Sequence, residues 1–266
     1  RWHTTQDMYT CSFRAISAIV IARNEEANVG DCLATVAWAD ERLVIDAFST
    51  DGTTQGLPPD VRLIERGWTD FADQRNAGLR LAVHDWVVFV DADERVPPKL
   101  SQEIQTRAGT EAFTGYWVPR RNRIFGRWMR GAGWWPDYQL RIMNRQYAAY
   151  VSDRSIHELV DVKGTAGHMA HHLEHLSYTS VAQFRARQRL YADAVADDYY
   201  RSGMRRRFTA VALQPLREFW RRLVSLRGYE DRGVGVLLAT LMAEHEWRVQ
   251  RALRARWKAD GGGMSR

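Results

Sequence analysis

Apolar runs and amphipathic segments alternate along the first part of the chain. Nearly continuous apolar runs, typical of strands covered on both faces, occupy residues 16–22, 43–45, 61–64 and 86–90. Between them, apolar positions at helical spacing predict helices over residues 28–38 and 70–82. Strand and helix in alternation require right-handed crossover connections. The pattern therefore predicts an α/β fold with a doubly wound, mostly parallel sheet flanked by helices.

The pattern changes twice further along the chain. From residue 113 to residue 175 the helical period is absent, which predicts additional strands and a long loop over residues 120–136. From residue 178 the pattern is helical and amphipathic almost to the end. The expected units are an N-terminal extension, an α/β domain in two halves, a helical extension and a disordered tail, at residues 1–14, 15–177 (halves 15–96 and 97–177), 178–258 and 259–266.

Polar side chains follow the predicted strands at their carboxyl ends. Asn24 and Glu25 follow the first strand, Asp46 the second, and Asp91 and Asp93 the fourth. Ligands of such sheets bind beyond the carboxyl ends of the strands, so we expect a site at this edge. Two carboxylates one residue apart suit Mg²⁺ or Mn²⁺, which take oxygen ligands and keep positions open for phosphate. The alternative is a solvated acidic turn that opens the next helix.

The charge of the chain is uneven. Its 38 basic and 32 acidic side chains give a net charge of +6, and residues 201–266 alone hold 15 basic and 6 acidic side chains. Amphipathic segments at residues 215–227 and 234–257 suit helices that lie on an anionic membrane surface. A helical cover packed on the sheet is the alternative. A nucleic-acid-binding module is a third possibility, but no nucleic acid partner is expected because no recognised motif is present.

Cysteine content and apolar run length indicate the compartment. Cys11 and Cys32 are too few for a disulfide framework and favour a reducing environment. The longest apolar run, residues 233–243, is shorter than the roughly 20 residues that a spanning helix needs. A cytoplasmic protein is therefore expected.

An ordered set of motifs gives the chain a family resemblance. The motifs are S-A-I-V-I-A-R-N-E-E at residues 17–26, V-I-D at 44–46, S-T-D-G-T at 49–53, V-D-A-D-E at 90–94, W-W-P-D-Y-Q-L-R at 134–141, I-H-E at 156–158 and H-L-S-Y at 175–178. Together they resemble glycosyltransferase family 2, and within it the lipopolysaccharide-core β-1,4-glucosyltransferase branch. The resemblance extends over about residues 15–250.

The resemblance implies a GT-A fold and an inverting, metal-dependent hexosyltransferase. Residues 15–96 become the nucleotide-sugar half and residues 97–177 the acceptor half. The implied metal is Mg²⁺ or Mn²⁺, and the implied donor is a nucleoside-diphosphate sugar, with UDP-glucose expected. The implied acceptor is a lipid-linked saccharide such as lipopolysaccharide core, reached by a peripheral enzyme at the cytoplasmic face of the inner membrane. A sugar-phosphate nucleotidyltransferase is the alternative enzyme, but the glycine-rich loop expected after its first strand is absent.

Carried over position by position, the resemblance also implies roles for individual residues. The donor site is expected to comprise Ala22, Arg23, Asn24, Glu25, Asp46, Arg75, Asp91, Ala92 and Asp93. Asp93 is implied as the principal metal ligand, with Asp91 beside it. Glu158 is the first choice for the base that takes the acceptor proton, and Asp137 is the second. The acceptor site is expected to comprise Arg120, Arg121, Trp134, Trp135, Gln139, Arg141 and His157, because arginine binds phosphate and tryptophan stacks on sugars.

The residues after the second predicted strand depart from the family pattern. The family usually continues after its second-strand acid with Ser-Gly-Ser-Thr-Asp, whereas Ala47 and Phe48 follow Asp46 here. The chain therefore lacks the family's glycine, which reaches positive φ easily, and it places a phenyl ring near the nucleoside.

Four histidines at residues 168, 171, 172 and 175 have helical spacing suited to zinc, but the family pattern places them on a strand. His175 alone can reach the metal or diphosphate, or it is a buried partner of a backbone carbonyl.

Overall fold

The computed structural model describes residues 14–109, 113–151, 159–204 and 208–260. The strands are β1 (Ile16–Ala22), β2 (Glu41–Asp46), β3 (Val61–Glu65), β4 (Trp86–Asp91), β5 (Glu94–Arg95), β6 (Gly115–Ile124), β7 (Arg127–Trp128), β8 (Asp137–Asn144), β9 (Ala148–Val151), β10 (Leu159–Val162), β11 (Ala166–His168) and β12 (Leu173–Tyr178). The helices are α1 (Val29–Thr35), α2 (Phe71–Leu81), α3 (Pro98–Arg107), α4 (Val181–Arg201), α5 (Phe208–Trp220) and α6 (Arg232–Ala259). Shorter helical turns are η1 (Gly52–Thr54), η2 (Arg221–Ser225) and η3 (Gly228–Asp231).

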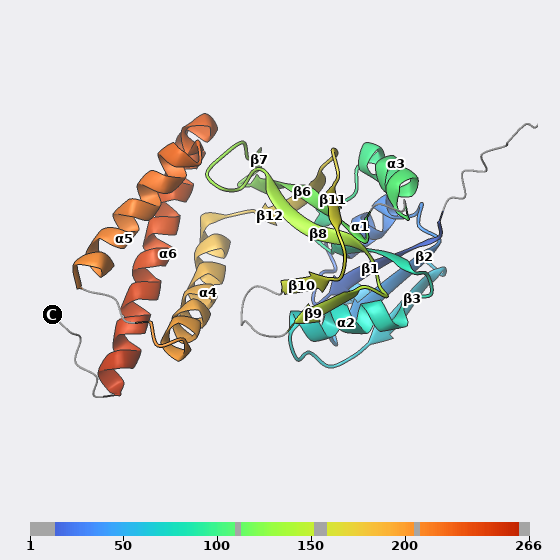
Figure 1. Cartoon of the computed structure of the whole chain (residues 1–266), viewed down its shortest axis with the longest axis horizontal. Coiled ribbons are helices and arrows are strands. Elements are labelled where there is room, and N and C mark those ends of the chain that lie inside the picture. The colour runs from blue at the N-terminus through green and yellow to red at the C-terminus, as the bar shows by residue number, and fades with distance from the viewer. Residues whose placement is uncertain (1–13, 110–112, 152–158, 205–207, 261–266) are drawn as a thin grey trace, which may run out of the picture.

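A mixed sheet forms the centre of the molecule (Figure 1). Its strands are ordered β3-β2-β1-β4-β8-β6-β12-β5. The first four are parallel, with Ala22 opposite Asp46 and Ile21 opposite Asp91. Strand β8 is antiparallel to both of its neighbours, β4 and β6, so β6 and the parallel β12 run in the same direction as the first four strands. The predicted α/β class with a mostly parallel, helix-flanked sheet is confirmed, and the carboxyl ends of β1, β2 and β4 meet at one edge.

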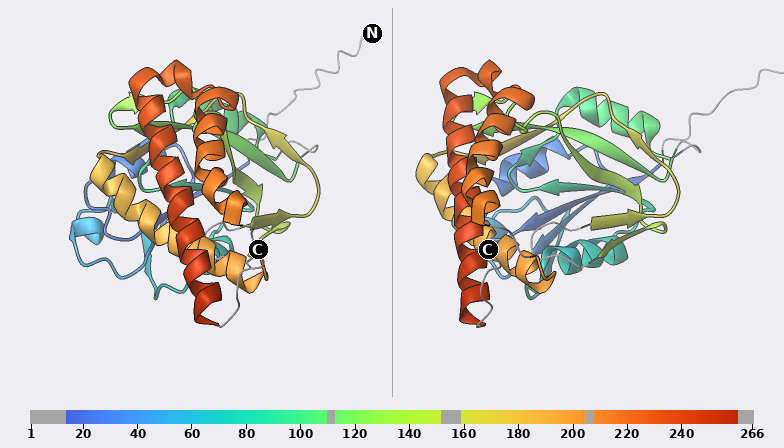
Figure 2. Two further views of the ribbon diagram at one scale, coloured as in Figure 1. Left: turned by 90° about the vertical axis from the view of Figure 1, so that its left-hand side faces the viewer. Right: turned by 60° about the vertical axis from the view of Figure 1, so that its left-hand side comes forward.

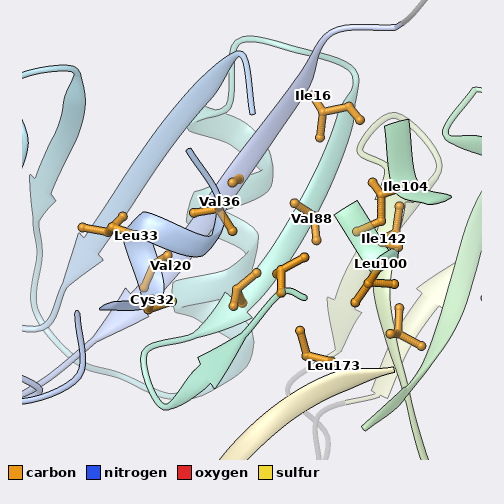
Figure 3. Close-up of a cluster of buried hydrophobic side chains, with 14 of the residues drawn as sticks. Ile16, Val20, Cys32, Leu33, Val36, Val88, Leu100, Ile104, Ile142 and Leu173 are labelled. Carbon is orange, nitrogen blue, oxygen red and sulfur yellow. The ribbon is translucent and has the colours of Figure 1, made fainter. Parts of the chain in front are cut away.

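Both faces of the parallel half are covered, as its apolar strands require. On one face, Leu33 of α1 and Ile104 of α3 share a buried cluster with Val20 of β1 (Figure 3). On the other face, Leu79 of α2 packs with Ile19. The neighbours Ile19 and Val20 thus enter opposite clusters, because successive residues of a strand point to opposite faces.

The helical extension lies beside one end of the sheet (Figures 1 and 2). Its helix α6 packs against both α4 and α5. Phe184 of α4 joins the extension to the sheet, since it shares a buried cluster with Ile124 of β6 and Tyr178 of β12. Among the described residues, no helix combines the length and the apolar character needed to cross a membrane.

Three boundaries differ from the sequence-based expectations. Residues 120–124 belong to β6, not to a loop. The strand was missed because Arg121 and Arg123 interrupt the apolar pattern, while Asn122 and Ile124, which alternate with them, are buried. The first helix ends at Thr35, and α6 continues through Ala259. The expected terminal segments lie outside the described residues at positions 1–13 and 261–266.

The start of α6 leaves no room for a side chain at Gly235. A Cβ added there overlaps the carbonyl oxygen of Gly228, whereas nothing lies within 4 Å of a Cβ added at Gly233. We predict that Gly235→Ala lowers the free energy of unfolding by about 1–3 kcal/mol, as overpacking does. Gly233→Ala is the matched control and should be neutral or stabilising, because alanine favours helix. Urea denaturation measures both, and equal losses would contradict this close packing.

Candidate active site

The loops that follow β1 and β2 hold one another by side-chain hydrogen bonds. Asn24 Oδ1 accepts from the backbone amide of Thr50 at 2.8 Å, and the amide of Asn24 donates to Ser49 Oγ at 2.8 Å. The amide of Glu25 donates to Thr53 Oγ1 at 2.7 Å. Asn24 has a φ of 55°, a left-handed conformation that asparagine tolerates better than most residues. These two loops lie at the carboxyl ends of β1 and β2, where the sequence predicts the donor site, and this edge of the sheet is called the donor edge from here on. Both loops are shaped before any ligand binds.

Asp46 organises the turn that follows β2 from a fully buried position. Its carboxylate accepts from the amide of Ser49 at 2.7 Å and from Ser49 Oγ at 2.5 Å. This corrects the expectation that the side chain of Asp46 lines the nucleoside pocket. Phe48 takes a φ of 53° and its ring is 60% exposed. Phe48 thus adopts a backbone conformation that usually requires glycine.

Asp91 lies in ion pairs with two arginines. Arg75 Nη2 is 3.0 Å from Asp91 Oδ1, and Arg141 Nη2 contacts Asp91 Oδ2. Desolvation raises the pKa of Asp91, but the charges of Arg141 and Arg75 outweigh it and hold this pKa well below its ordinary value. The carboxylate of Asp91 thus anchors the two arginines, and its role as a second metal ligand stays a prediction.

Glu94 completes this ion cluster and was not singled out as a site residue from the sequence. Its side chain is fully buried, with Oε2 accepting from the amide of Asp91 at 2.9 Å and Oε1 lying 2.8 Å from Arg141 Nη2. Arg141 is only 4% exposed, so it cannot contact an acceptor as the sequence suggested. Arg120 is also tied to carboxylates, with Nη1 lying 3.4 Å from Glu94 Oε1.

Asp137, the second choice for the base, is held by three side chains. Its Oδ2 lies 2.6 Å from Arg120 Nη2 and 3.3 Å from Asn122 Nδ2, while its Oδ1 accepts from Gln139 Nε2 at 2.8 Å. Burial raises the pKa of Asp137, but Arg120 outweighs it and lowers this pKa below its ordinary value. A lowered pKa weakens a carboxylate as a base. Glu158 and His157 lie outside the described residues.

Asp93 faces the imidazole ring of His175. Asp93 Oδ2 is 3.2 Å from His175 Nε2, and His175 Nδ1 is 2.6 Å from Asn122 Oδ1. Asn122 Nδ2 donates to the carbonyl oxygen of Trp134 at 2.9 Å, so its Oδ1 is the acceptor for His175. His175 therefore carries a proton on Nδ1 and turns its Nε2 toward the carboxylate of Asp93. A histidine that binds a metal through one ring nitrogen usually donates its other N–H to an oxygen in this way, which fixes the orientation of the ring.

The donor set at Asp93 fits a divalent ion that is shared with a phosphate. Among the described residues, no group of three or more histidine, cysteine and acidic side chains could by itself hold a metal. Mg²⁺ commonly binds through one or two carboxylates, with waters and substrate phosphates filling the other positions. Of the two expected ions, Mn²⁺ is the transition metal, and a nitrogen ligand suits a transition-metal ion better than it suits Mg²⁺. The residues present therefore fit Mg²⁺ or Mn²⁺ with Asp93 and His175 as protein ligands.

The remaining expected residues fall into three environments. Ala22, Ala92 and Arg75 are buried, and Arg23 is exposed on the donor loop. The partly buried ring of Trp134 packs against Tyr178 and Phe184, with its centroid 6.2 Å from the centroid of each of their rings, and its assignment to the acceptor site stays a prediction. Arg121 and Trp135 line a separate pocket. Of the four histidines, His168 and His175 lie on β11 and β12, so the strand placement is confirmed for them.

Arg187 of α4 is a site residue that the sequence did not reveal. Its guanidinium lies 5.9 Å from the ring centroid of Tyr178. Burial lowers the pKa of Arg187, but Tyr191, Tyr178, Asp93 and Glu25 together raise it above its ordinary value. Arg187 therefore brings a positive charge to the donor edge from a helix of the extension. No local motif marks it, because only the packing of α4 brings it there.

Comparison with known proteins identifies the family. The sequence profile described as "Glycosyl transferase family 2" matches residues 17–157, more than half of the chain. The chain belongs to glycosyl transferase family 2. The family resemblance seen in the sequence is thereby confirmed, together with glycosyltransferase activity, and the nucleotidyltransferase alternative is disfavoured.

Individual family members extend this finding. The chain is 27% identical over 267 residues to the lipopolysaccharide core biosynthesis glycosyltransferase LpsC of Rhizobium meliloti (strain 1021), covering 92% of this chain and 96% of LpsC. It is 23% identical over 209 residues to an uncharacterized glycosyltransferase of Rickettsia felis, covering 71% of each. The solved mannosyltransferase PcManGT from Pyrobaculum calidifontis, in complex with GDP-Man and Mn2+, has a TM-score of 0.54 at 16% identity, covering 94% of this chain and 89% of that one. The last comparison shows a shared fold.

The ion cluster makes Arg141 a sensitive position. Arg141→Met removes the guanidinium that Asp91 and Glu94 share and leaves only Arg75 beside Asp91 and Arg120 beside Glu94. Breaking a buried pair in this way costs about 3–5 kcal/mol, and we predict a loss of that size at pH 7 by chemical denaturation. Arg185→Met is the control, because the Arg185 side chain is 50% exposed in its pair with Glu244. The control should lose no more than about 1 kcal/mol.

The loss in Arg141→Met should shrink between pH 7 and pH 5. Without the charge of Arg141, burial raises the pKa of the Asp91 carboxyl, and a carboxyl with a raised folded pKa takes up its proton preferentially in the native state as pH falls. In the wild type the pKa of Asp91 is lowered, so its contribution persists above about pH 4 and is lost only on further acidification. A loss that stays constant with pH would contradict the buried ion cluster.

Proposed function

We propose that the chain transfers a hexose, expected to be glucose, from UDP to a lipid-linked saccharide with inversion at the anomeric carbon. The observation that carries this proposal is the facing pair of Asp93 and His175 at the carboxyl edge of the parallel strands. The Mn2+ and GDP-Man bound by PcManGT support a metal and a nucleotide-sugar donor. The name of LpsC supports a role in lipopolysaccharide core assembly.

The proposed mechanism divides the labour at the donor edge among residues of this chain. Asp93 and His175 hold Mg²⁺ or Mn²⁺, which when bound supplies positive charge to the leaving diphosphate. Arg187 adds a second positive charge on the side of the extension. The loop of Asn24 and Glu25 forms the edge of the nucleoside site, where the exposed ring of Phe48 offers a surface for base stacking. These groups are fixed before the reaction, so little reorganisation accompanies bond cleavage.

We assign the general base to Glu158, as the sequence indicates. The structure offers one supporting argument, which is that Asp137 is occupied by Arg120, Asn122 and Gln139 and has a lowered pKa. A base has to accept the acceptor proton near neutral pH, and this environment opposes protonation of Asp137.

We further propose that the extension rests on an anionic membrane surface. Leu213, Leu216, Trp220 and Val224 are half or more exposed, and their spacing of three and four residues places them on one side of α5 and η2. Arg217 and Arg221 are exposed beside this apolar stripe. A helix surface of this kind buries its apolar side at the headgroup boundary while its arginines meet anionic lipid.

Transfer or hydrolysis of UDP-glucose with Mn²⁺ tests the catalytic proposal. Asp93→Asn keeps the shape of the side chain but removes its charge, and turnover should fall about 100-fold or more, as it does when one transition-state contact is lost. Asp31→Asn is the control, since the acidic side chain of Asp31 is 82% exposed. If no nucleotide sugar binds with or without metal, or if Asp93→Asn stays fully active, the proposal is wrong.

A pair of isosteric variants tests the base assignment in the same assay. Glu158→Gln should abolish most transfer and remove the acidic limb of the pH–rate profile, because that limb reports the catalytic base. If Glu158→Gln instead keeps full transfer while Asp137→Asn loses it together with that limb, the base is Asp137.

Sedimentation with phosphatidylglycerol vesicles tests the membrane proposal. The double variant Leu216→Ala/Trp220→Ala should bind vesicles at least about tenfold more weakly, because two apolar side chains no longer leave water. Leu190→Ala on α4 is the control, since Leu190 is 71% exposed but lies outside the stripe. Equal binding by all three proteins would show that the extension is only a structural cover.

A further inference from the structure

A pocket of about 810 Å³ lies between the loop after β7 and the turns that join α5 to α6. Residues from both sides line it, including Arg130 and Trp135 from the loop and Leu226 and Arg227 from the extension. None of the donor-site residues described above borders it. The pocket therefore belongs jointly to the acceptor half and to the helical extension.

The lining of this pocket carries a positive charge. Arg121, Arg130 and Arg227 all border it, and the acidic residue among its lining residues, Glu230, is ion-paired with Arg227. Burial, and then the charge of Arg121, lower the pKa of His172, so this histidine adds no charge at neutral pH. Arginine forks at the wall of a concave site match the oxygens of phosphate or carboxylate.

Apolar groups in the same lining favour a sugar rather than a bare anion. Trp135 borders the pocket with its ring 5.8 Å from the ring of His172. Met129 and Leu226 also contribute apolar surface. A tryptophan beside arginines suits a saccharide that carries an acidic group, because the ring packs on the sugar face while the arginines meet its charge.

The pocket is shaped before any ligand binds. The carboxylate of buried Asp231 accepts from the amides of Arg130 at 2.8 Å and Gly131 at 2.9 Å. The amide of Ala132 donates to the carbonyl oxygen of Leu226 at 2.7 Å. These bonds fix the loop against the extension, and a site fixed in advance avoids the cost of ordering on binding.

The position of the pocket separates it from the donor diphosphate. Successive residues of β6 point to opposite faces, with Asn122 contacting His175 and Arg121 bordering the pocket. The apolar stripe of α5 and η2 ends at Val224, and the next residue, Ser225, lines the pocket. An occupant thus meets the protein on the side of the stripe and away from the donor.

We propose that this pocket binds a phosphate- or carboxylate-bearing sugar of the membrane-anchored acceptor, at a distance from the hydroxyl that reacts. The identity of the occupant as acceptor rests on the proposed function, whereas anion binding by the pocket does not. Binding of a remote group contributes to catalysis by holding the reacting hydroxyl in place.

Calorimetric titration with a hexose phosphate, a hexuronic acid and a neutral hexose tests anion binding. The wild type should bind one or both acidic probes more tightly than the neutral one, and the stronger probe shows whether phosphate or carboxylate is preferred. Arg130→Gln/Arg227→Gln should weaken that binding about tenfold or more and leave UDP affinity unchanged. Arg189→Gln, an exposed arginine of α4, is the control and should match the wild type. The proposal is wrong if the wild type binds all three probes equally. It is also wrong if the double variant binds the acidic probes as tightly as the wild type does.

Transfer kinetics separate failure of the pocket from failure of the proposed function. In an assay with UDP-glucose and a lipopolysaccharide acceptor, the double variant should raise the KM for the acceptor about tenfold and leave the KM for the donor unchanged. An unchanged acceptor KM in an active enzyme overturns the pocket and leaves the proposed function standing. Acidic probes that bind in an Arg130- and Arg227-dependent manner to a protein without transfer activity support the pocket and overturn the proposed function.

Discussion

The guanidinium of Arg141 is buried between the carboxylates of Asp91 and Glu94, and these two ion pairs hold the centre of the sheet together. These residues come from β8, β4 and β5, so the cluster joins the parallel half of the sheet to the mixed half. A buried charge without its partner costs several kcal/mol, so each of these strands can be buried only when the others are in place. The turn that carries Asp93 lies between Asp91 and Glu94 and is fixed from both sides.

From Glu94 a chain of polar contacts returns to Asp93 by another route. Arg120 links Glu94 to Asp137, Asn122 links Asp137 to His175, and His175 faces Asp93. Asn122 holds a proton on Nδ1 of His175 in this chain, and Nε2 is therefore the atom that faces the carboxylate. The acceptor half therefore supplies and orients His175, the proposed partner of Asp93 in metal binding. The two halves are one catalytic unit in this account, and the extension contributes Arg187 to it.

Sequence reasoning succeeded where the signal was local. The apolar runs of β1 and β4 predicted strands because a strand covered on both faces has to be apolar throughout. It failed where the partner was distant in sequence, since nothing near Arg141 indicates that it meets Asp91 and Glu94. The same applies to Trp134, because nothing in its Trp-Trp-Pro setting indicates that its partly buried ring packs against Tyr178 and Phe184. In each case the residue type was informative, but only the sheet topology decided which face it occupies.

Pulsed electron paramagnetic resonance of the Mn²⁺ complex with UDP tests whether Asp93 and His175 bind the metal together. A histidine ligand couples its nitrogen nucleus to the manganese electron spin. If both residues bind the metal, the wild type shows a nitrogen coupling that disappears in His175→Asn, and Asp93→Asn binds Mn²⁺ more weakly. A Mn²⁺–UDP complex that shows no nitrogen coupling from His175, with unchanged Mn²⁺ affinity in both variants, would contradict it.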